Sequence, residues 1–491
     1  MNTADKQQVN HINVKNLLEI AAALSKEKDY NKLLTRILRE AMDITNCDGG
    51  TLYLLIDGAL HFKIMRTISM NYYKGADGEK IALPPVALSK KNVCACAALN
   101  KQMINIDDVY CSDKYDFSGP RNYDKMTGYQ TRSMLVVPME DYYGDIIGVL
   151  QLINAQNQNG EVIAFNKKYE EAITSLASLA AVSITNMNYI EEIKEILHSF
   201  VEVISTAIDE RTPYNANHTK NMVRYGKAFI KYLNEQVGGI YTFDENREEQ
   251  FLMSVWLHDI GKMVIPLEIM NKETRLSSAI YSIKSRFELI GLLNKIALLR
   301  GEISEQDYEQ KTLELNDDLK MLEQANTIGF LNDDLLSCVR AVAAKTYRNE
   351  QGEVCFYLTE EEYNLLTIRF GTLTNKERQI MESHVAITEK LLNKIAFSKD
   401  YNNVTFWASS HHEYLNGCGY PRHLTADELP FEVRVLTILD IYDALTARDR
   451  PYKPPMPAEK ALAVLEDMAD KGQLDKKVVE LFIASCAWEA K

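Results

Sequence analysis

The sequence predicts a multidomain protein in which an α+β first domain is joined by one long helix to an all-α second half with a mostly helical insertion. The chain has 491 residues, too many for one core, because domains usually hold about 100–200 residues. β-rich runs with turn signals are concentrated before residue 160. Beyond residue 200 apolar residues recur mainly at spacings of three and four, which is typical of helices.

The composition indicates a folded protein that is not a general binder of polyanions. Hydrophobic residues make up 46% and charged residues 25%, as in ordinary globular chains, and the formal net charge is -14. This charge argues against nucleic acid as a partner and against binding to anionic membranes. No apolar run approaches the roughly 20 residues that span a bilayer, and "MNTADKQQVN" lacks a signal peptide's apolar segment. We therefore expect a cytoplasmic protein without a membrane span.

The eight cysteines are scattered along the chain, which favours reduced thiols over a disulfide framework. One residue separates Cys94 from Cys96, and the chain has no second pair of cysteines with this spacing. They are interpreted as core or surface thiols, with metal binding as the alternative.

The first domain is expected over residues 18–188, after an N-terminal helical segment at residues 1–17. The run "NVKNLLEIAAALSKEKDYNKLLTRILREAMDIT" has the apolar spacing of two amphipathic helices. Asp57-Gly58 separates two β-rich runs and predicts a hairpin, and a second hairpin is expected to turn near Gly144. Helices beside an antiparallel sheet make this domain α+β.

A connecting helix is predicted over residues 165–208, a stretch without proline or glycine. Its apolar residues at three-and-four spacing are Leu176, Ala180, Met187, Ile190, Leu197, Val201, Ile204 and Ile208. This stripe favours a dimeric coiled coil. The alternative is that each half of the helix packs on its own domain.

The second half, residues 196–491, is expected to be all-α, with an insertion at 277–372. A helical hairpin is predicted to turn at Gly301, and a short β-hairpin around Gln351-Gly352. The insertion could reshape access to a site in the surrounding domain.

Five histidines in this half lie in or at the ends of predicted helices, near aspartates. They are His218, His258, His384, His411 and His412. Three of them form the pairs His258-Asp259 and His411-His412, and Asp440 lies in the apolar run "VLTILDIYDAL". Neighbouring helical residues diverge by about 100°, so each pair suits two adjacent ions better than one closed site. A lone histidine is more often a core residue, but an unpaired carboxylate in an apolar run is costly to bury. Imidazole with carboxylate favours Fe, Mn or Zn, and the lack of cysteine argues against structural zinc.

The motifs "LHDIGK", "HHEYLNGCGYP" and "LDIYDALTARDRPYK" resemble those of the HD-GYP phosphodiesterases. These are HD-domain metallohydrolases that cleave the bacterial second messenger cyclic di-GMP. "NANHTKNMVRYG" resembles the stretch with the family's first metal histidine, and "GTLTNKERQIMESHVAITEKLL" the helix with a later one. The resemblance covers residues from about 200 to 491, apart from the insertion.

The resemblance implies two divalent metal ions, Fe or Mn, with Zn, Mg and Ni as alternatives. The implied ligands are His218, His258, Asp259, His384, His411, His412 and Asp440. Catalytic roles fall on Asp259 as the bridging ligand, on Lys262 near the phosphate, and on Asp443, which would orient the nucleophilic water or a ligand. Substrate contacts fall on Lys262, Gly419, Tyr420, Pro421, Arg450 and Lys453. Two adjacent ions supply the nucleophile and the charge neutralisation that phosphodiester hydrolysis needs.

Several positions depart from the family pattern. Asn416-Gly417 stands where Asp-Gly is usual, and Asn221-Met222 where Arg-Val is common. Tyr214 occupies a position where some members have an additional carboxylate ligand, which favours two ions over three. The "GYP" element also has a plain interpretation as a tight loop after a helix, with no function of its own.

The stretch "SGPRNYDKMTGYQTRSMLVVPMEDYYGDIIGVLQLINAQN" resembles a GAF domain, with a likeness over residues 18–188. The signature of cyclic-nucleotide-binding members is only partial, with Asn154-Ala155, then Phe165, then Tyr169-Glu170. A cyclic nucleotide, another small ligand, and a ligand-free dimerisation module all remain open.

The combined expectation is a GAF-regulated phosphodiesterase that hydrolyses cyclic di-GMP to pGpG, GMP or both. It would form a homodimer through the GAF domain and the connecting helix. Two alternatives stay open: an HD-type phosphohydrolase for another cyclic or linear nucleotide, and a non-hydrolytic cyclic di-GMP receptor or scaffold.

Overall fold

The computed structural model describes residues 14–76, 78–211, 217–349, 351–447 and 455–490. It divides into two compact units, residues 1–196 and 197–491. The first is α+β and the second is mostly helical, which confirms the predicted fold class.

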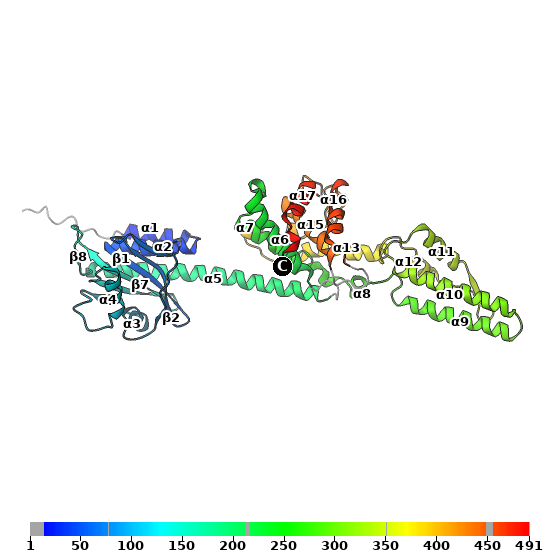
Figure 1. Cartoon of the computed structure of the whole chain (residues 1–491), viewed down its shortest axis with the longest axis horizontal. Helices are drawn as coiled ribbons and strands as arrows, with labels where there is room; N and C mark the ends of the chain where they lie inside the picture. Colours follow the sequence, from blue (N-terminus) through cyan, green and yellow to red (C-terminus); the bar gives the residue numbers. More distant parts are fainter. Residues whose placement is uncertain (1–13, 77, 212–216, 350, 448–454, 491) are drawn as a thin grey trace, which may run out of the picture. The chain divides into compact units, whose positions relative to one another are not determined.

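The first unit is built on one antiparallel sheet with the path β3-β2-β1-β7-β6-β5; β4 pairs with β2, and β8 with β7 (Figure 1). The strands are β1 (Cys47–Ile56), β2 (Ala59–Thr67), β3 (Tyr72–Gly75), β4 (Val86–Ala87), β5 (Ile104–Ile106), β6 (Met134–Glu140), β7 (Ile146–Gln156) and β8 (Val162–Ile163). The Asp57-Gly58 hairpin is confirmed, because both residues have positive φ and Ile56 pairs with Ala59. The second hairpin, between β6 and β7, turns at Gly144.

Helices cover both faces of this sheet. They are α1 (Val14–Lys26), α2 (Tyr30–Thr45), α3 (Val93–Asn100), α4 (Ser118–Thr127) and α5 (Glu170–Asp209). Side chains alternate along a strand, so Leu52 and Leu54 of β1 join one core with α2 and α5. Tyr53, between them, joins the other core with α3.

Helix α5 packs within its own units with the stripe that was predicted as a dimer seam. Leu176 and Ala180 are buried in the core of the first unit, and Val201 in a core of the second. Most of the predicted stripe therefore packs within each unit, as in the alternative interpretation, whereas Ile190 is exposed. A second stripe on α5 stays exposed: Val182, Tyr189, Ile193, Ile196, Phe200 and Val203.

The second unit surrounds a helical core. Outside the insertion its helices are α6 (His218–Tyr232), α7 (Glu245–Leu257), α8 (Leu267–Met270), α13 (Asn375–Leu392), α14 (Val404–Ala408), α15 (Phe431–Thr446), α16 (Ala458–Asp470) and α17 (Lys476–Ser485). Short helical turns lie between them, of which η4 (Ile260–Val264) follows α7. Residues of α6, α7, α15, α16 and α17 share the largest core.

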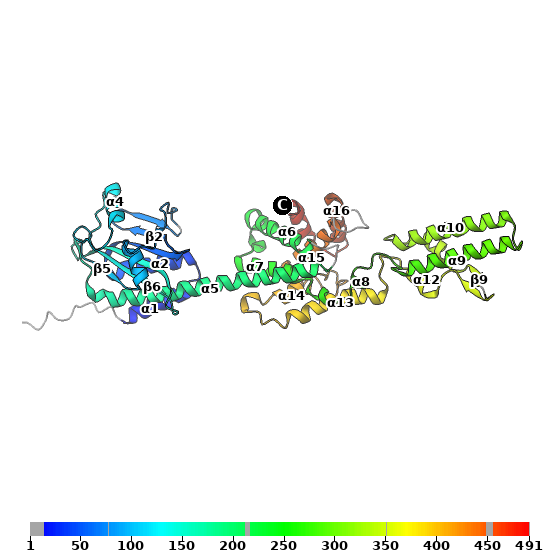
Figure 2. The ribbon, with the colours of Figure 1, turned by 90° about the horizontal axis from the view of Figure 1, so that it is seen from below.

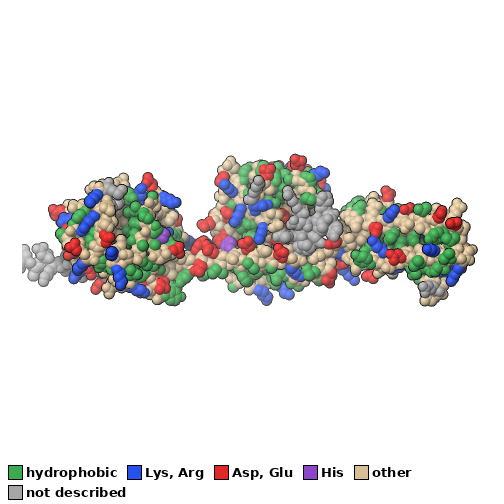
Figure 3. Space-filling view, turned by 60° about the horizontal axis from the view of Figure 1, so that its bottom comes forward, with side chains coloured by type: hydrophobic (Ala, Val, Ile, Leu, Met, Phe, Trp, Pro, Cys, Tyr) green, Lys and Arg blue, Asp and Glu red, His purple; other side chains and the backbone are tan. Residues whose placement is uncertain are grey.

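The insertion has a core of its own, made only of residues between 276 and 366. Its elements are α9 (Ala279–Leu299), α10 (Glu305–Thr327), α11 (Asp333–Ala343), β9 (Thr346–Arg348), β10 (Val354–Phe356) and α12 (Glu360–Leu366). The helical hairpin α9–α10 turns at Gly301 and the β-hairpin near Gly352, as predicted (Figure 2). Hydrophobic side chains gather on the face of this insertion that Figure 3 shows.

Candidate metal centre

Seven histidine and aspartate side chains meet in the second unit. His218 begins α6, His258 ends α7, and Asp259 begins the turn into η4. The others are His384 in α13, His411 and His412 in the turn after α14, and Asp440 in α15. All but His412 are buried. Elements separated by up to 222 residues thus contribute to one site.

Asp259 lies between two groups of histidines. Its Oδ2 is 3.3 Å from His258 Nε2 and 3.9 Å from His218 Nε2. Its Oδ1 is 3.3 Å from His384 Nε2 and 3.9 Å from His411 Nε2. One carboxylate with a different set of rings at each oxygen suits a bridge between two cations.

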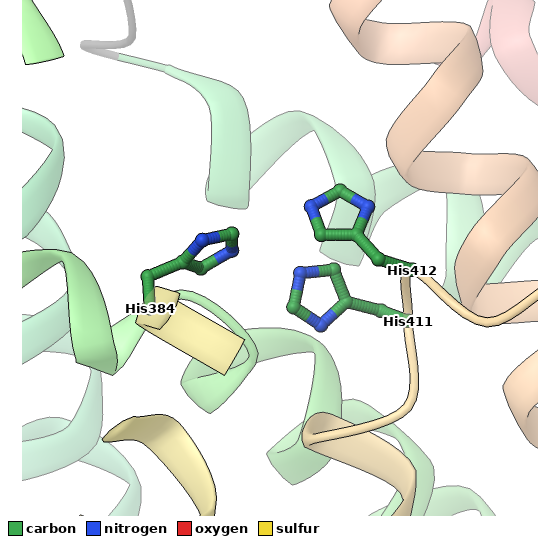
Figure 4. Close-up of side chains that lie close together, drawn as sticks. All are labelled: His384, His411 and His412. Carbon is green, nitrogen blue, oxygen red and sulfur yellow. The ribbon is translucent and has the colours of Figure 1, made fainter. Parts of the chain in front are cut away.

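Asp440 links the same two groups from the opposite helix. Its Oδ1 is 3.4 Å from His218 Nε2, and its Oδ2 is 3.7 Å from His412 Nδ1. The rings of His384, His411 and His412 point toward one another from two segments of the chain (Figure 4). Two candidate sets of donor atoms result, His218-His258-Asp259 and His384-His411-His412.

Hydrogen bonds orient four of the five rings. Nδ1 of His258, His384 and His411 lies 2.6–2.7 Å from the carbonyls of Val255, Met381 and Ala408, each three residues earlier. Nδ1 of His218 lies 2.7 Å from Asp443 Oδ2. If each Nδ1 donates its proton to these oxygens, each Nε2 is left with a lone pair directed into the cluster, the usual arrangement of metal-binding histidines.

The donor atoms fit divalent cations. Asp259 Oδ1, His384 Nε2 and His411 Nε2 are buried and, within the described part of the chain, have no hydrogen-bond partner. Buried polar atoms are rarely left without a partner, and a cation would satisfy all three. A set of imidazole nitrogens and carboxylate oxygens, without thiolate, suits Fe, Mn or Zn.

The protonation states also fit. Burial disfavours charged rings; it keeps the pKa of His411 well below its usual range and lowers the pKa of His412 to about 4. For His218 burial is outweighed by Asp440 and Asp443, which raise its pKa to about 10, so this ring would release a proton when a cation binds. Burial also opposes ionisation of Asp440, but the hydrogen bond and charge of His218 hold its pKa far below the usual range. Two neutral rings and an ionised carboxylate are therefore ready to bind a cation.

The other predicted site residues fall into three groups. Lys262 forms an ion pair with Asp259, and Asp443 contacts His218, so both adjoin the cluster. The ring of Tyr420 lies 4.9 Å from that of His412. Arg450 and Lys453, like Tyr214, lie outside the described residues.

The "GYP" loop folds back on the histidine pair. A Cβ on Gly419 would come within 2.5 Å of the backbone at His412, Glu413 and Tyr414, so only glycine allows this approach. The Tyr420 N–H donates to the His412 carbonyl at 3.1 Å. The loop therefore helps to fix His411 and His412, a structural role that the sequence alone did not reveal.

Thr388 is a further residue at the site that sequence reasoning missed. Its buried hydroxyl donates to the His258 carbonyl and accepts from the Gly261 N–H, both at 3.0 Å. It lies one turn after His384 on α13, a spacing that could have indicated its position. Gly261 permits the contact, because a Cβ there would meet the His384 carbonyl oxygen at 1.9 Å.

Family models match two segments of the chain. Residues 29–184 match the model described as GAF domain, and residues 360–478 match the one described as HD domain. The chain carries a GAF domain and an HD domain. The HD match contains His384, His411, His412 and Asp440, and the structure adds His218, His258 and Asp259 from outside the matched range.

The proteins similar in sequence to this chain include two bacterial phosphodiesterases. A "3'3'-cGAMP-specific phosphodiesterase 3" of Vibrio cholerae serotype O1 is 38% identical over 21% of this chain and 22% of that protein. A "Cyclic di-GMP phosphodiesterase" of Thermotoga maritima is 34% identical over 24% of this chain and 31% of that protein. The match thus spans less than a third of either relative.

Among solved structures, the GAF domain of an Acinetobacter phosphoenolpyruvate-protein phosphotransferase aligns with 37% of this chain and 96% of its own. The identity is 14% and the TM-score is 0.29. Among the described residues, no helix combines the length and apolar character that a bilayer crossing requires.

Proposed function

We propose that this chain is a metal-dependent phosphodiesterase that hydrolyses cyclic di-GMP and is regulated by its GAF domain. The observation that carries the proposal is the meeting of five histidines and two aspartates around two candidate ion positions. The HD-domain match and the names of the two bacterial relatives support the reaction class. The product would be pGpG, GMP or both.

The proposed ligands are the seven side chains of the cluster, and the proposed ions are Fe or Mn. Such ions would activate water and neutralise charge on the phosphate. Asp443 would hold the His218 ring in the tautomer that leaves Nε2 free.

Lys262 is the proposed electrostatic partner of the phosphate. Its burial disfavours the charge, but Asp259 outweighs this effect and raises the pKa of Lys262, so the ammonium persists at neutral pH. Gly419, Tyr420 and Pro421 are proposed to line the substrate site, with Arg450 and Lys453 as further phosphate contacts.

A hybrid cyclic dinucleotide is a second candidate substrate. The relative with 38% identity is named for 3'3'-cGAMP, which differs from cyclic di-GMP in one base. Hydrolysis of a hybrid cyclic dinucleotide is therefore the rival proposal for this metal centre.

The GAF domain is proposed to sense a small ligand. A cavity of about 560 Å³ opens in the first unit, lined by apolar and aromatic side chains that include Tyr53, Phe62 and Met134. Gln151 on its wall accepts hydrogen bonds from Tyr53 and Cys94. Such a mixture of apolar walls and a few polar groups is typical of small-molecule sites.

The chain is proposed to form a homodimer through the exposed stripe on α5. Tyr189, Ile193, Ile196, Phe200 and Val203 follow one another at spacings of four, three, four and three. This heptad pattern matches the a and d positions of a coiled coil, where two copies of one stripe are complementary to each other.

The proposed function is tested with the His258→Ala/Asp259→Ala double variant and with metal analysis of the wild type. The wild type should contain Fe or Mn and hydrolyse cyclic di-GMP, and the variant should lose both properties. His198→Ala is the control, because His198 contacts Glu249 rather than the cluster. Turnover of only another dinucleotide would favour the rival substrate, and turnover by the double variant would refute the assignment.

A further inference from the structure

Two polar side chains, one at the C-terminal end of α5 and one in the turn directly after it, contact the segments that carry the clustered residues. Asp209 is the last residue of α5 and is 4% exposed. Its carboxylate accepts hydrogen bonds from the backbone N–H and the hydroxyl of Thr219, both at 3.3 Å. Thr219 directly follows His218 and is itself buried. Asp209 thus fixes the start of α6, where His218 lies.

Arg211 contacts the other segment. Its guanidinium donates to the carbonyl oxygens of Lys262 at 2.9 Å and Ile265 at 3.3 Å, and also to the carbonyl of Met263. These carbonyls belong to η4 and the residue after it, directly beyond His258 and Asp259. A planar group with five donors in a rigid fork can hold several backbone oxygens in one arrangement.

The two contacts therefore act on two different segments of the cluster. Asp209 holds the segment with His218, and Arg211 holds the segment with Asp259; His218 Nε2 lies 3.9 Å from Asp259 Oδ2. From the side of α13, Thr388 fixes the same His258-Asp259 turn. Loss of the guanidinium would leave the η4 carbonyls to find other partners, and the turn would shift to supply them.

We infer that Asp209 and Arg211 are positioning residues of the metal centre, which tie the distance between His218 and Asp259 to the last turn of α5. The inference rests on the proposed function and extends it. Because Asp209 ends α5 and Arg211 lies in the turn directly after it, a displacement of this end of the helix would move two of the clustered segments at once. This gives the helix that follows the GAF domain a direct physical route to the ligands.

The first test compares Arg211→Met with Arg286→Met in the full chain. Arg286 also holds a loop carbonyl, that of Tyr357, together with Glu362, but it belongs to the insertion. Residues that orient metal ligands usually change affinity or activity by about 10–100-fold. We expect Arg211→Met to weaken Mn²⁺ binding at least about tenfold and to lower kcat with KM changed less than about twofold. Arg286→Met should lower only Tm.

Mn²⁺ affinity is measured by calorimetry, without substrate, so this readout stands even if the wild type does not hydrolyse cyclic di-GMP. Equal Mn²⁺ affinity in the wild type and Arg211→Met would overturn the inference. Equal losses in Arg211→Met and Arg286→Met would also overturn it, because they would show a general effect of stability.

The second test uses Asp209 and does not depend on the folding of the Arg211 variant. Asp209→Asn keeps an oxygen for the Thr219 N–H and an amide that can bond the hydroxyl, whereas Asp209→Ala keeps neither. We expect Asp209→Asn to retain Mn²⁺ affinity and Asp209→Ala to lose it, which is rescue by the conservative variant. Retention by both variants, or equal loss in both, would refute the positioning role of Asp209.

Discussion

At the scale of single residues, the metal centre depends on where backbone atoms can approach one another. Gly419 and Gly261 lie where a Cβ would collide with the main chain of the histidine-bearing segments. His258, His384 and His411 are oriented by carbonyls three residues earlier, contacts that form only in the folded turns. The chemistry of the ligands and the packing of small residues are therefore inseparable at this site.

Gly419→Ala should disrupt the site, because the new methyl group would lie 2.5 Å from backbone atoms that cannot move independently of His412. We expect a loss of about 2 kcal/mol in the free energy of unfolding, together with weaker Mn²⁺ binding. Chemical denaturation and calorimetry measure the two effects. Gly329→Ala is the control, since nothing lies within 4 Å of its added Cβ. Equal behaviour of both variants would contradict the close-packing argument.

The clustering of the seven side chains could be predicted from sequence because their motifs stay intact within short stretches. His258-Asp259 and His411-His412 are adjacent in the chain, and Asp440 stands out as a carboxylate in an apolar helix. Thr388 and Arg211 were not accessible, because their function lies in hydrogen bonds to carbonyls of distant segments. A hydroxyl or guanidinium carries no local pattern that names its partner.

At the scale of elements, α13 begins with a reciprocal capping arrangement that also receives an ion pair. The Thr374 hydroxyl accepts from the Glu377 N–H, and the Glu377 carboxylate accepts from the Thr374 N–H at 2.7 Å. Lys272 Nζ lies 2.8 Å from the same carboxylate. The start of the helix that carries His384 is thus fixed by charge as well as by its cap.

Glu377→Gln should lower Tm at pH 7 but not in acid. Burial disfavours the charge of Glu377, but the hydrogen bonds from Lys272 and Thr374 together outweigh it and lower the pKa of Glu377. A depressed pKa stabilises the fold above the unfolded value of about 4.3, and this stabilisation is lost as the pH falls through the folded value. At pH 7 the free energy of unfolding of Glu377→Gln should be lower than that of the wild type by up to about 1 kcal/mol. Thermal unfolding from pH 7 to pH 3 measures it.

The control is Glu459→Gln, which removes an exposed carboxylate from the first turn of α16. Its effect on Tm should be smaller at every pH. A Glu377→Gln difference that stays constant down to pH 3 would show that charge plays no part at the start of α13.

The sequence predicted the extent of helix α5 but not which of its apolar stripes is buried. Its continuous helical run was evident from the absence of proline and glycine. It carries two apolar stripes, however, and the sequence does not say which one its own units bury. Only the burial of Leu176 and Val201 identifies the inner stripe, and this leaves Ile193, Ile196 and Phe200 on the exposed one.

Ile196→Glu should therefore abolish the proposed dimer without unfolding either unit. Ile196 is 61% exposed and occupies the centre of the heptad stripe, so a carboxylate there would face its own copy across the seam. Sedimentation equilibrium measures the change from dimer to monomer, with Tm as the check on folding. Glu195→Lys, an exposed change outside the stripe, should leave the dimer intact. A wild-type chain that sediments as a monomer would refute the seam.

At the scale of the whole molecule, the chain is assembled from parts whose cores are separate. The GAF domain has two cores on the faces of its sheet, and the second unit has its own. The insertion adds another, with every member between residues 276 and 366. The sequence predicted the extent of the insertion as a break in the family resemblance, but not the independence of its core, which depends on contacts between distant helices.

Replacing residues 273–371 with a short Gly-Ser linker should leave the metal centre intact. The two ends of the insertion meet, because the Thr372 hydroxyl donates to the Lys272 carbonyl at 2.8 Å, so a short linker can join them. The shortened chain should bind Mn²⁺ with unchanged affinity, since the insertion contributes none of the seven clustered side chains. Calorimetry measures this directly. Loss of Mn²⁺ binding in a shortened chain that still unfolds cooperatively would mean that the insertion supports the ligand-bearing helices, and its separate core would then be no measure of independence.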